Sequence, residues 1–161
     1  MKAVIQIVQD CSLIADGEPY SSISNGMLIL LGIKSDDTPE NAQLLADRIL
    51  KTRIFPDEND RINLAVTTGE REIMVVSNFT LYADCTKSRR PDFFRSAKSD
   101  VAKPLYEYFL KYISLKAKEY GSAEGATIPK IANGKFGADM KISFTADGPI
   151  TVIIDTDELM K

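Results

Sequence analysis

The chain has 161 residues, a length that suits one domain and buries a core without help from a disulfide or a structural metal. Hydrophobic residues make up 44% of it and charged residues 27%, an ordinary globular balance that argues against long disorder. The formal net charge is −3, which disfavours a protein that coats nucleic acid through a wide basic face. This net charge is still compatible with a protein that binds only the end of an RNA.

Histidine is absent from the sequence. This excludes Ser-His-Asp and Cys-His catalysis and His-ligated zinc, so an enzyme of this composition must move protons with carboxylates, hydroxyls, lysines, water or the substrate itself. Cys11 and Cys85 are far apart in sequence, and two unpaired thiols are typical of a reduced compartment. No leader-like start and no apolar run of about 20 residues is visible, so we expect a cytoplasmic protein with no membrane partner.

The first third of the chain predicts four β-segments. They cover residues 2–9, 11–15, 18–23 and 27–33. Asp16-Gly17 and Asn25-Gly26 predict the turns that follow the second and third segments. The fourth segment is continuously apolar, which is typical of a central strand buried on both faces.

Two helices are predicted in the rest of the chain. Thr38 is the expected N-cap of the first, with Pro39 at its first helical position. The second runs from about residue 100 to 119, and Gly121 is expected to end it. Further strands are predicted at residues 72–77, 140–145 and 150–155. The order of elements indicates one α+β domain over residues 1–161, a largely antiparallel sheet or open β-barrel with two helices packed outside.

Two polar segments are candidates for chemistry. The strand at residues 72–77 stops at Ser77-Asn78-Phe79-Thr80, where hydroxyls, an amide and unpaired backbone N–H groups can meet a ligand or hold an oxyanion. A strand end capped by its own hydroxyls is the alternative interpretation. Gly148-Pro149 separates the last two predicted strands. The peptide bond before a proline is the kind that can adopt the cis form, which would be a fixed feature of the fold. The alternative interpretation is an ordinary turn.

Together these segments resemble the signatures of a known family. Residues 75–84 are similar to the Ser-Gln-x-Thr signature of the D-aminoacyl-tRNA deacylases, also called D-tyrosyl-tRNA(Tyr) deacylases, and residues 147–151 are similar to their Gly-Pro signature. Other matching segments run almost from end to end, at residues 1–6, 26–32, 53–55, 63–64, 89–91, 93, 104–106 and 134–140.

The resemblance implies hydrolysis of the ester that joins a D-amino acid to the 3′ end of tRNA, a chiral proofreading reaction, with no cofactor, no metal and no DNA partner. It implies a homodimer in which Gly148 and Pro149, joined by a cis bond, enter the other subunit's active site and exclude L side chains by steric clash. Glycine esters should also enter.

The resemblance also assigns roles to residues. The backbone N–H near Phe79 would stabilise the oxyanion, and Ser77, Asn78 and Thr80 would line the same pocket. Since no histidine can activate Thr80, we expect attack by water assisted by the ribose hydroxyl of the substrate. The terminal adenosine would lie against Phe136 and Met140. Contacts to tRNA phosphates are assigned to Lys87, Arg89 and Arg90, for which a solvated basic loop is the alternative.

Two positions depart from the family pattern. Asn78 replaces glutamine and is one methylene shorter, which can misplace a hydrogen bond by about an ångström and cost about a hundredfold in rate. Ile7 replaces the usual arginine, so a Gly-Pro loop steadied by that arginine would discriminate less well here. These departures motivate a rival hypothesis, a divergent member that binds tRNA or D-amino acids with weak or no hydrolysis. A second rival is a hydrolase directed at another small residue such as glycine.

Overall fold

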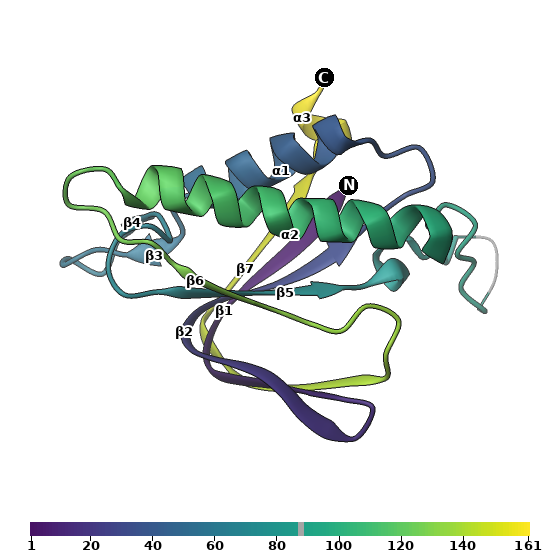
Figure 1. Cartoon of the computed structure of the whole chain (residues 1–161), viewed down its shortest axis with the longest axis horizontal. Helices are drawn as coiled ribbons and strands as arrows, with labels where there is room; N and C mark the ends of the chain where they lie inside the picture. Colours follow the sequence, from purple (N-terminus) through teal and green to yellow (C-terminus); the bar gives the residue numbers. More distant parts are fainter. Residues whose placement is uncertain (87–88) are drawn as a thin grey trace.

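A five-stranded sheet organises the chain, and two long helices lie together over one of its faces (Figure 1). The computed structural model describes residues 1–86 and 89–161. The strands of this sheet are β1 Lys2–Ala15, β2 Glu18–Gly32, β5 Glu72–Ser77, β6 Lys130–Asn133 and β7 Met140–Asp155. A separate two-stranded ribbon consists of β3 Phe55–Pro56 and β4 Ile62–Leu64. The helices are α1 Pro39–Lys51, the 3-10 turn η1 Phe79–Tyr82, α2 Ser99–Gly121 and α3 Thr156–Leu159.

The sheet is mixed and open. Its strand order is β6-β5-β2-β1-β7, in which β1 pairs antiparallel with β2 and β7, whereas β5 pairs parallel with β2 and β6. The long pairings are therefore antiparallel, as predicted, and the predicted α+β class is confirmed. The sequence left open whether the strands form a sheet or an open β-barrel. They form an open sheet, because the edge strands β6 and β7 do not pair to close a barrel.

The turn predicted at Asn25-Gly26 is wrong, because β2 runs straight through both residues. Gly26 serves instead as a point of close approach between β2 and β5. A Cβ atom built on Gly26 would lie 1.8 Å from the carbonyl oxygen of Glu72, so any side chain here would push β5 away. The two β-segments predicted at residues 2–9 and 11–15 are likewise one strand, β1.

The two strands predicted near the C-terminus also form one element, β7. Its pairing with β1 shifts register at two places, between Gln6 and Val8 and between Gln9 and Ser12. At the first, Gln6 pairs with Thr151 and Val8 with Ala146, so residues 147–150 stand opposite Ile7 alone. We call residues 147–150 the Gly-Pro bulge. Bulges of this kind re-aim a chain without ending the strand, and the pairing of β7 with β1 on both sides holds the bulge in place.

The predicted start of the first helix is confirmed, with Thr38 as N-cap and Pro39 in the first turn. The Thr38 N–H donates to Asn41 Oδ1 over 2.8 Å, which satisfies one terminal donor. The predicted stop at Gly121 is wrong, since α2 includes this residue and is capped by Ser122. The short helix α3 was not predicted. Within the described residues, no helix combines the length and apolarity needed to span a membrane.

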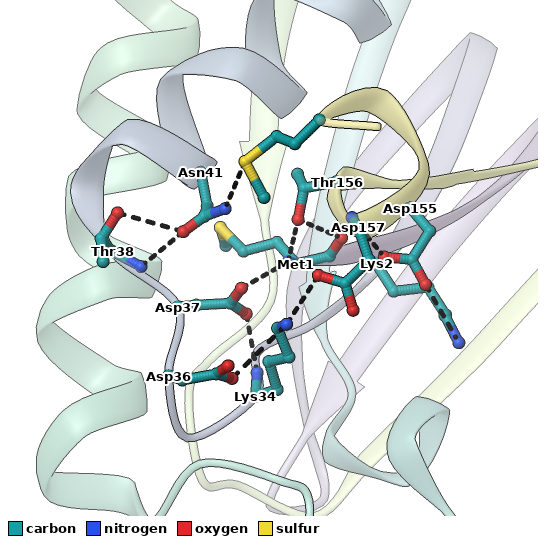
Figure 2. A network of polar contacts seen from close by, with 11 residues as sticks. Met1, Lys2, Lys34, Asp36, Asp37, Thr38, Asn41, Asp155, Thr156 and Asp157 are labelled. Carbon is teal, nitrogen blue, oxygen red and sulfur yellow. Dashed lines mark hydrogen bonds and ion pairs between the residues drawn. The ribbon is translucent and has the colours of Figure 1, made fainter.

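A buried polar network joins the start of β1 to the segment after β2 and to α3 (Figure 2). The Met1 ammonium group lies 2.5 Å from Asp37 Oδ1 and 2.5 Å from Thr156 Oγ1, and the side chain of Asp37 is 0% exposed. The second oxygen of Asp37 accepts the Lys34 N–H over 2.7 Å. Burial raises the pKa of the Asp37 carboxyl, and the hydrogen bonds from the ammonium and from Lys34 oppose this rise.

Candidate active site

A pocket of about 700 Å³ opens where β5 ends. Its walls come from η1, from the first residues of α2 and from residues 136–140, and its apolar floor from β2, β5 and β7. The lining residues are Leu30, Leu31, Ile33, Val76, Ser77, Asn78, Phe79, Thr80, Ala97, Ser99, Ala102, Phe136, Gly137, Ala138, Asp139, Met140 and Ile142. The size and the mixed polar and apolar lining are typical of a site for a small organic ligand.

Six of the predicted site residues line this one pocket. Four of them are consecutive in the chain, and the other two follow β6, about sixty positions later in the sequence. They are Ser77, Asn78, Phe79, Thr80, Phe136 and Met140. The parallel pairing of β5 with β6 brings the two segments together, because the Gly134 N–H donates to the Val75 carbonyl over 2.8 Å just before the chain enters the pocket wall.

The side chain of Asn78 shapes the turn at the end of β5. Its Oδ1 accepts the Thr80 N–H over 3.1 Å and the Thr80 hydroxyl over 2.5 Å, so it caps η1. An amide oxygen is not a base, and the Thr80 hydroxyl therefore gains no activation from this contact. The shorter amide has a structural use here that the sequence did not reveal.

The backbone of Phe79 lies at the pocket wall. Its carbonyl accepts the Ser96 hydroxyl over 2.8 Å, which ties η1 to the segment before α2. Among the residues that the structure describes, no acceptor contacts the Phe79 N–H. A backbone donor with no internal acceptor beside a pocket can bind a ligand oxygen or a developing negative charge.

Phe136 is held from behind by Tyr106. The two ring centroids are 5.7 Å apart, and the Tyr106 hydroxyl lies 2.9 Å from the Val75 carbonyl and 3.1 Å from that of Gly134. Burial raises the pKa of Tyr106, so its hydroxyl stays protonated and can donate. These contacts fix a flat, half-buried aromatic surface inside the pocket.

Two polar lining residues were not predicted. Asp139, an exposed residue, is the one ionisable side chain among those that line the pocket, and Ser99 comes from the first turn of α2. Asp139 lies inside the matching segment 134–140, a signal that was available, whereas nothing local marked Ser99. Within the described residues, no group of three or more His, Cys, Asp or Glu side chains is placed to hold a metal ion.

Gly148 and Pro149 do not line the pocket of their own chain, although the peptide bond between them is cis. Both are exposed, in the Gly-Pro bulge. The side chain of Gln6 holds the C-terminal flank of the bulge: its Nε2 donates to the Ile150 carbonyl over 3.2 Å, and Thr151 Oγ1 donates to its Oε1 over 2.5 Å.

A second glutamine holds the other flank of the bulge. Gln9 Nε2 donates to Asp147 Oδ2 over 3.0 Å, so the Gly-Pro bulge is tied to β1 on both sides. Ile7, between the two glutamines, is 2% exposed and belongs to the core beneath the helices.

The predicted phosphate contacts Arg89 and Arg90 are exposed and outside the pocket lining, and Lys87 lies outside the described residues.

Comparisons with known proteins agree with this architecture. Residues 4–155 match the model of the D-Tyr-tRNA(Tyr) deacylase family. The chain is 40% identical over 159 residues to the D-aminoacyl-tRNA deacylase of Thermosipho africanus, covering 99% of both chains. It is 41% identical over 161 residues to that of Dictyoglomus turgidum, covering 100% of this chain and 96% of the other.

Two solved structures share the fold. A c-Myc DNA unwinding element binding protein superposes with a TM-score of 0.83 at 33% identity, over 96% of this chain and 98% of the other. A probable eukaryotic D-amino acid tRNA deacylase superposes with a TM-score of 0.79 at 20% identity, over 95% and 97% of the two chains. The chain therefore belongs to the D-Tyr-tRNA(Tyr) deacylase family.

Proposed function

We propose that this protein hydrolyses the ester of D-aminoacyl-tRNA and releases the free D-amino acid and tRNA. The observation that carries the proposal is the single pocket in which the segment 77–80 meets Phe136 and Met140, on a chain that matches deacylases from end to end. The reaction is a step of tRNA editing, which clears wrongly attached D-amino acids. The alternative of a member without activity is not favoured by the relatives from Thermosipho africanus and Dictyoglomus turgidum, both of which are D-aminoacyl-tRNA deacylases by name.

The terminal adenosine of the tRNA lies against Phe136 and Met140 in this proposal. Unpaired bases are recognised by stacking on aromatic side chains, and the Phe136 ring is held in place through Tyr106. The ester then lies near Ser77, Phe79 and Thr80, because these residues line the same pocket.

The protein contributes position and hydrogen-bond donors to the chemistry. The Phe79 N–H is the donor for the oxyanion, and water attacks the ester with help from the ribose hydroxyl next to it, without a metal. The Thr80 hydroxyl is not the nucleophile, since its partner is the amide oxygen of Asn78.

Asp139 is the one carboxylate in the lining that can serve as a general base instead. Asp139→Asn should leave the rate of ester hydrolysis unchanged, and a large fall in kcat would assign the base role to Asp139.

Selection against L-amino acids requires a second subunit in this proposal. The Gly-Pro bulge is exposed on β7, an edge strand with one unpaired side, and it does not reach its own pocket. A long unpaired edge favours contact with another chain. In a homodimer the rigid bulge of one subunit closes the pocket of the other and leaves room for hydrogen or a D side chain, whereas an L side chain clashes with it.

The polynucleotide partner is the 3′ end of tRNA. The cationic side chains Arg89 and Arg90, with Lys87, contact its phosphates, while the net charge of −3 disfavours broad binding to nucleic acid, DNA included. In this proposal the protein acts in the cytoplasm, where it meets its tRNA substrate, and the reaction needs no cofactor.

Hydrolysis of three substrates by the purified protein tests the proposal. We expect D-tyrosyl-tRNA to be cleaved rapidly, L-tyrosyl-tRNA to persist, and glycyl-tRNA to be cleaved because glycine has no side chain to clash. Retention of D-tyrosine at stoichiometric protein would refute the deacylase activity. Release of glycine alone would indicate a hydrolase directed at glycine.

A further inference from the structure

Two phenylalanine rings in contact with each other extend from the pocket onto the segment of residues 89–96, which we call the rim loop. Phe79 lines the pocket and is 58% exposed, and Phe93 packs edge-on against it with ring centroids 5.2 Å apart. Phe94 follows in sequence and is 92% exposed. A single exposed phenylalanine needs no explanation, but an exposed aromatic set that continues from a pocket indicates a binding surface.

The backbone of the rim loop is held firmly, so the exposure of Phe94 does not come from a loose segment. Asp84 and Asp92 exchange two backbone hydrogen bonds of 2.7 and 2.9 Å, and the Phe94 N–H donates to Asp92 Oδ1 over 2.6 Å. Further along, the Ser96 hydroxyl donates to the Phe79 carbonyl over 2.8 Å. A ring presented in solvent by a fixed backbone loses little entropy when a ligand covers it.

The rim loop carries three arginines against one carboxylate, Asp92, so its charge is positive, unlike that of the chain as a whole. Arg89, Arg90 and Arg95 are all exposed on the rim loop, whereas the protein carries a net charge of −3. The guanidinium group of Arg95 lies 5.7 Å from the centroid of the Tyr82 ring, which limits where this charge can move. Aromatic rings between arginines are typical of sites that bind single-stranded nucleic acid, because bases stack on the rings and phosphates approach the cations.

We propose that Phe94 stacks on a base of the unpaired nucleotides that precede the terminal adenosine of the tRNA. The inference rests on the proposed function, in which that adenosine fills the pocket, since the preceding nucleotides must then leave through its mouth beside Phe79 and Phe93. A second copy of this chain is a poorer occupant, because its own three arginines would repel those of the rim loop. The rim loop thus recognises the single strand, and the pocket recognises the ester.

Substrates of increasing length test this division of labour. D-tyrosyl-adenosine reaches only the pocket, whereas a D-tyrosyl-CCA trinucleotide and D-tyrosyl-tRNA also reach the rim loop. We expect Phe94→Ala to lower kcat/KM by roughly 5- to 150-fold for the two longer substrates, the range for loss of one stacked base, and to leave the adenosine ester unaffected. Phe94→Tyr should retain the activity. Leu115→Ala, which removes a side chain that is 62% exposed late in α2, is the matched control.

Each other outcome has a definite meaning. An equal loss on all three substrates would overturn the proposal by placing Phe94 in the pocket chemistry, and no loss on any would overturn it outright. A Phe94→Ala protein that changes its sedimentation coefficient would assign the surface to a second copy. If the unaltered protein cleaves no ester, the proposed function fails separately. Binding of an uncharged CCA trinucleotide, measured by fluorescence anisotropy, then still reports on the rim loop through the same variants.

Discussion

Asp37→Asn tests how much of the stability comes from the buried ammonium of Met1. Both carboxylate oxygens of Asp37 accept N–H donors, from the ammonium and from the backbone of Lys34, and the side chain is 0% exposed (Figure 2). An amide keeps the shape but has one acceptor oxygen, so one donor loses its partner and the ammonium loses its counter-charge. Breaking a buried ion pair in this way costs about 3–5 kcal/mol. For a chain of this length, the loss lowers Tm by about 6–20 °C.

Asp36→Asn is the matched control, because Asp36 is the neighbouring carboxylate and pairs with Lys34 at 3.5 Å while remaining 75% exposed. An exposed pair contributes at most about 1 kcal/mol, so this variant should unfold within about 4 °C of the original protein. Thermal unfolding followed by circular dichroism measures both variants at the same pH. Equal melting temperatures for the two variants would refute the reasoning, because burial would then not decide the strength of the contact.

Three further predictions concern the site and the thiols. Gln6→Ala removes two hydrogen bonds, one to Ile150 in the Gly-Pro bulge and one from Thr151 next to it, about 2 kcal/mol in total. It should lower the ratio of D- to L-tyrosyl-tRNA hydrolysis by up to about 30-fold while D-tyrosyl-adenosine binding persists. Asn78→Gln should lower kcat about fivefold rather than raise it, because the longer side chain loses the cap of η1; a gain in kcat would contradict this reading. Cys85 should react with a thiol-specific disulfide reagent in the folded protein, whereas burial raises the pKa of Cys11 to about 11 and should protect that thiol until urea unfolds the chain.

Local patterns predicted the elements whose signals lie within a few residues. The start of α1 followed from Thr38 and Pro39 because capping is a local interaction. The course of β2 could not be predicted from local patterns, because Asn25-Gly26 is ordinarily a turn signal. The contact that keeps the strand extended there is between Gly26 and Glu72, which lies 46 positions away in β5. The continuity of β7 was missed for the same reason: its two halves are joined by their shared partner β1.

The candidate site was also predictable only in part. The segment 77–80 was predicted because an apolar strand that ends in polar groups is visible in the sequence, and the family signatures singled out Phe136 and Met140. That these segments share a pocket depends on the parallel pairing of β5 with β6, which no local pattern encodes. Ser99 was missed because a serine at the start of a helix ordinarily reads as a cap.

The replacement of the family arginine by Ile7 leaves other polar contacts between β1 and the Gly-Pro bulge in place. Successive strand residues point to opposite faces, so Ile7 is buried with the core while its neighbour Gln6 is free to contact β7. The polar ties to the Gly-Pro bulge therefore come from Gln6 on one flank and Gln9 on the other. A bulge held on both flanks keeps its position without the arginine, because each flank is fixed to the same strand. Discrimination between D and L substrates should then depend on Gln6 more than on position 7.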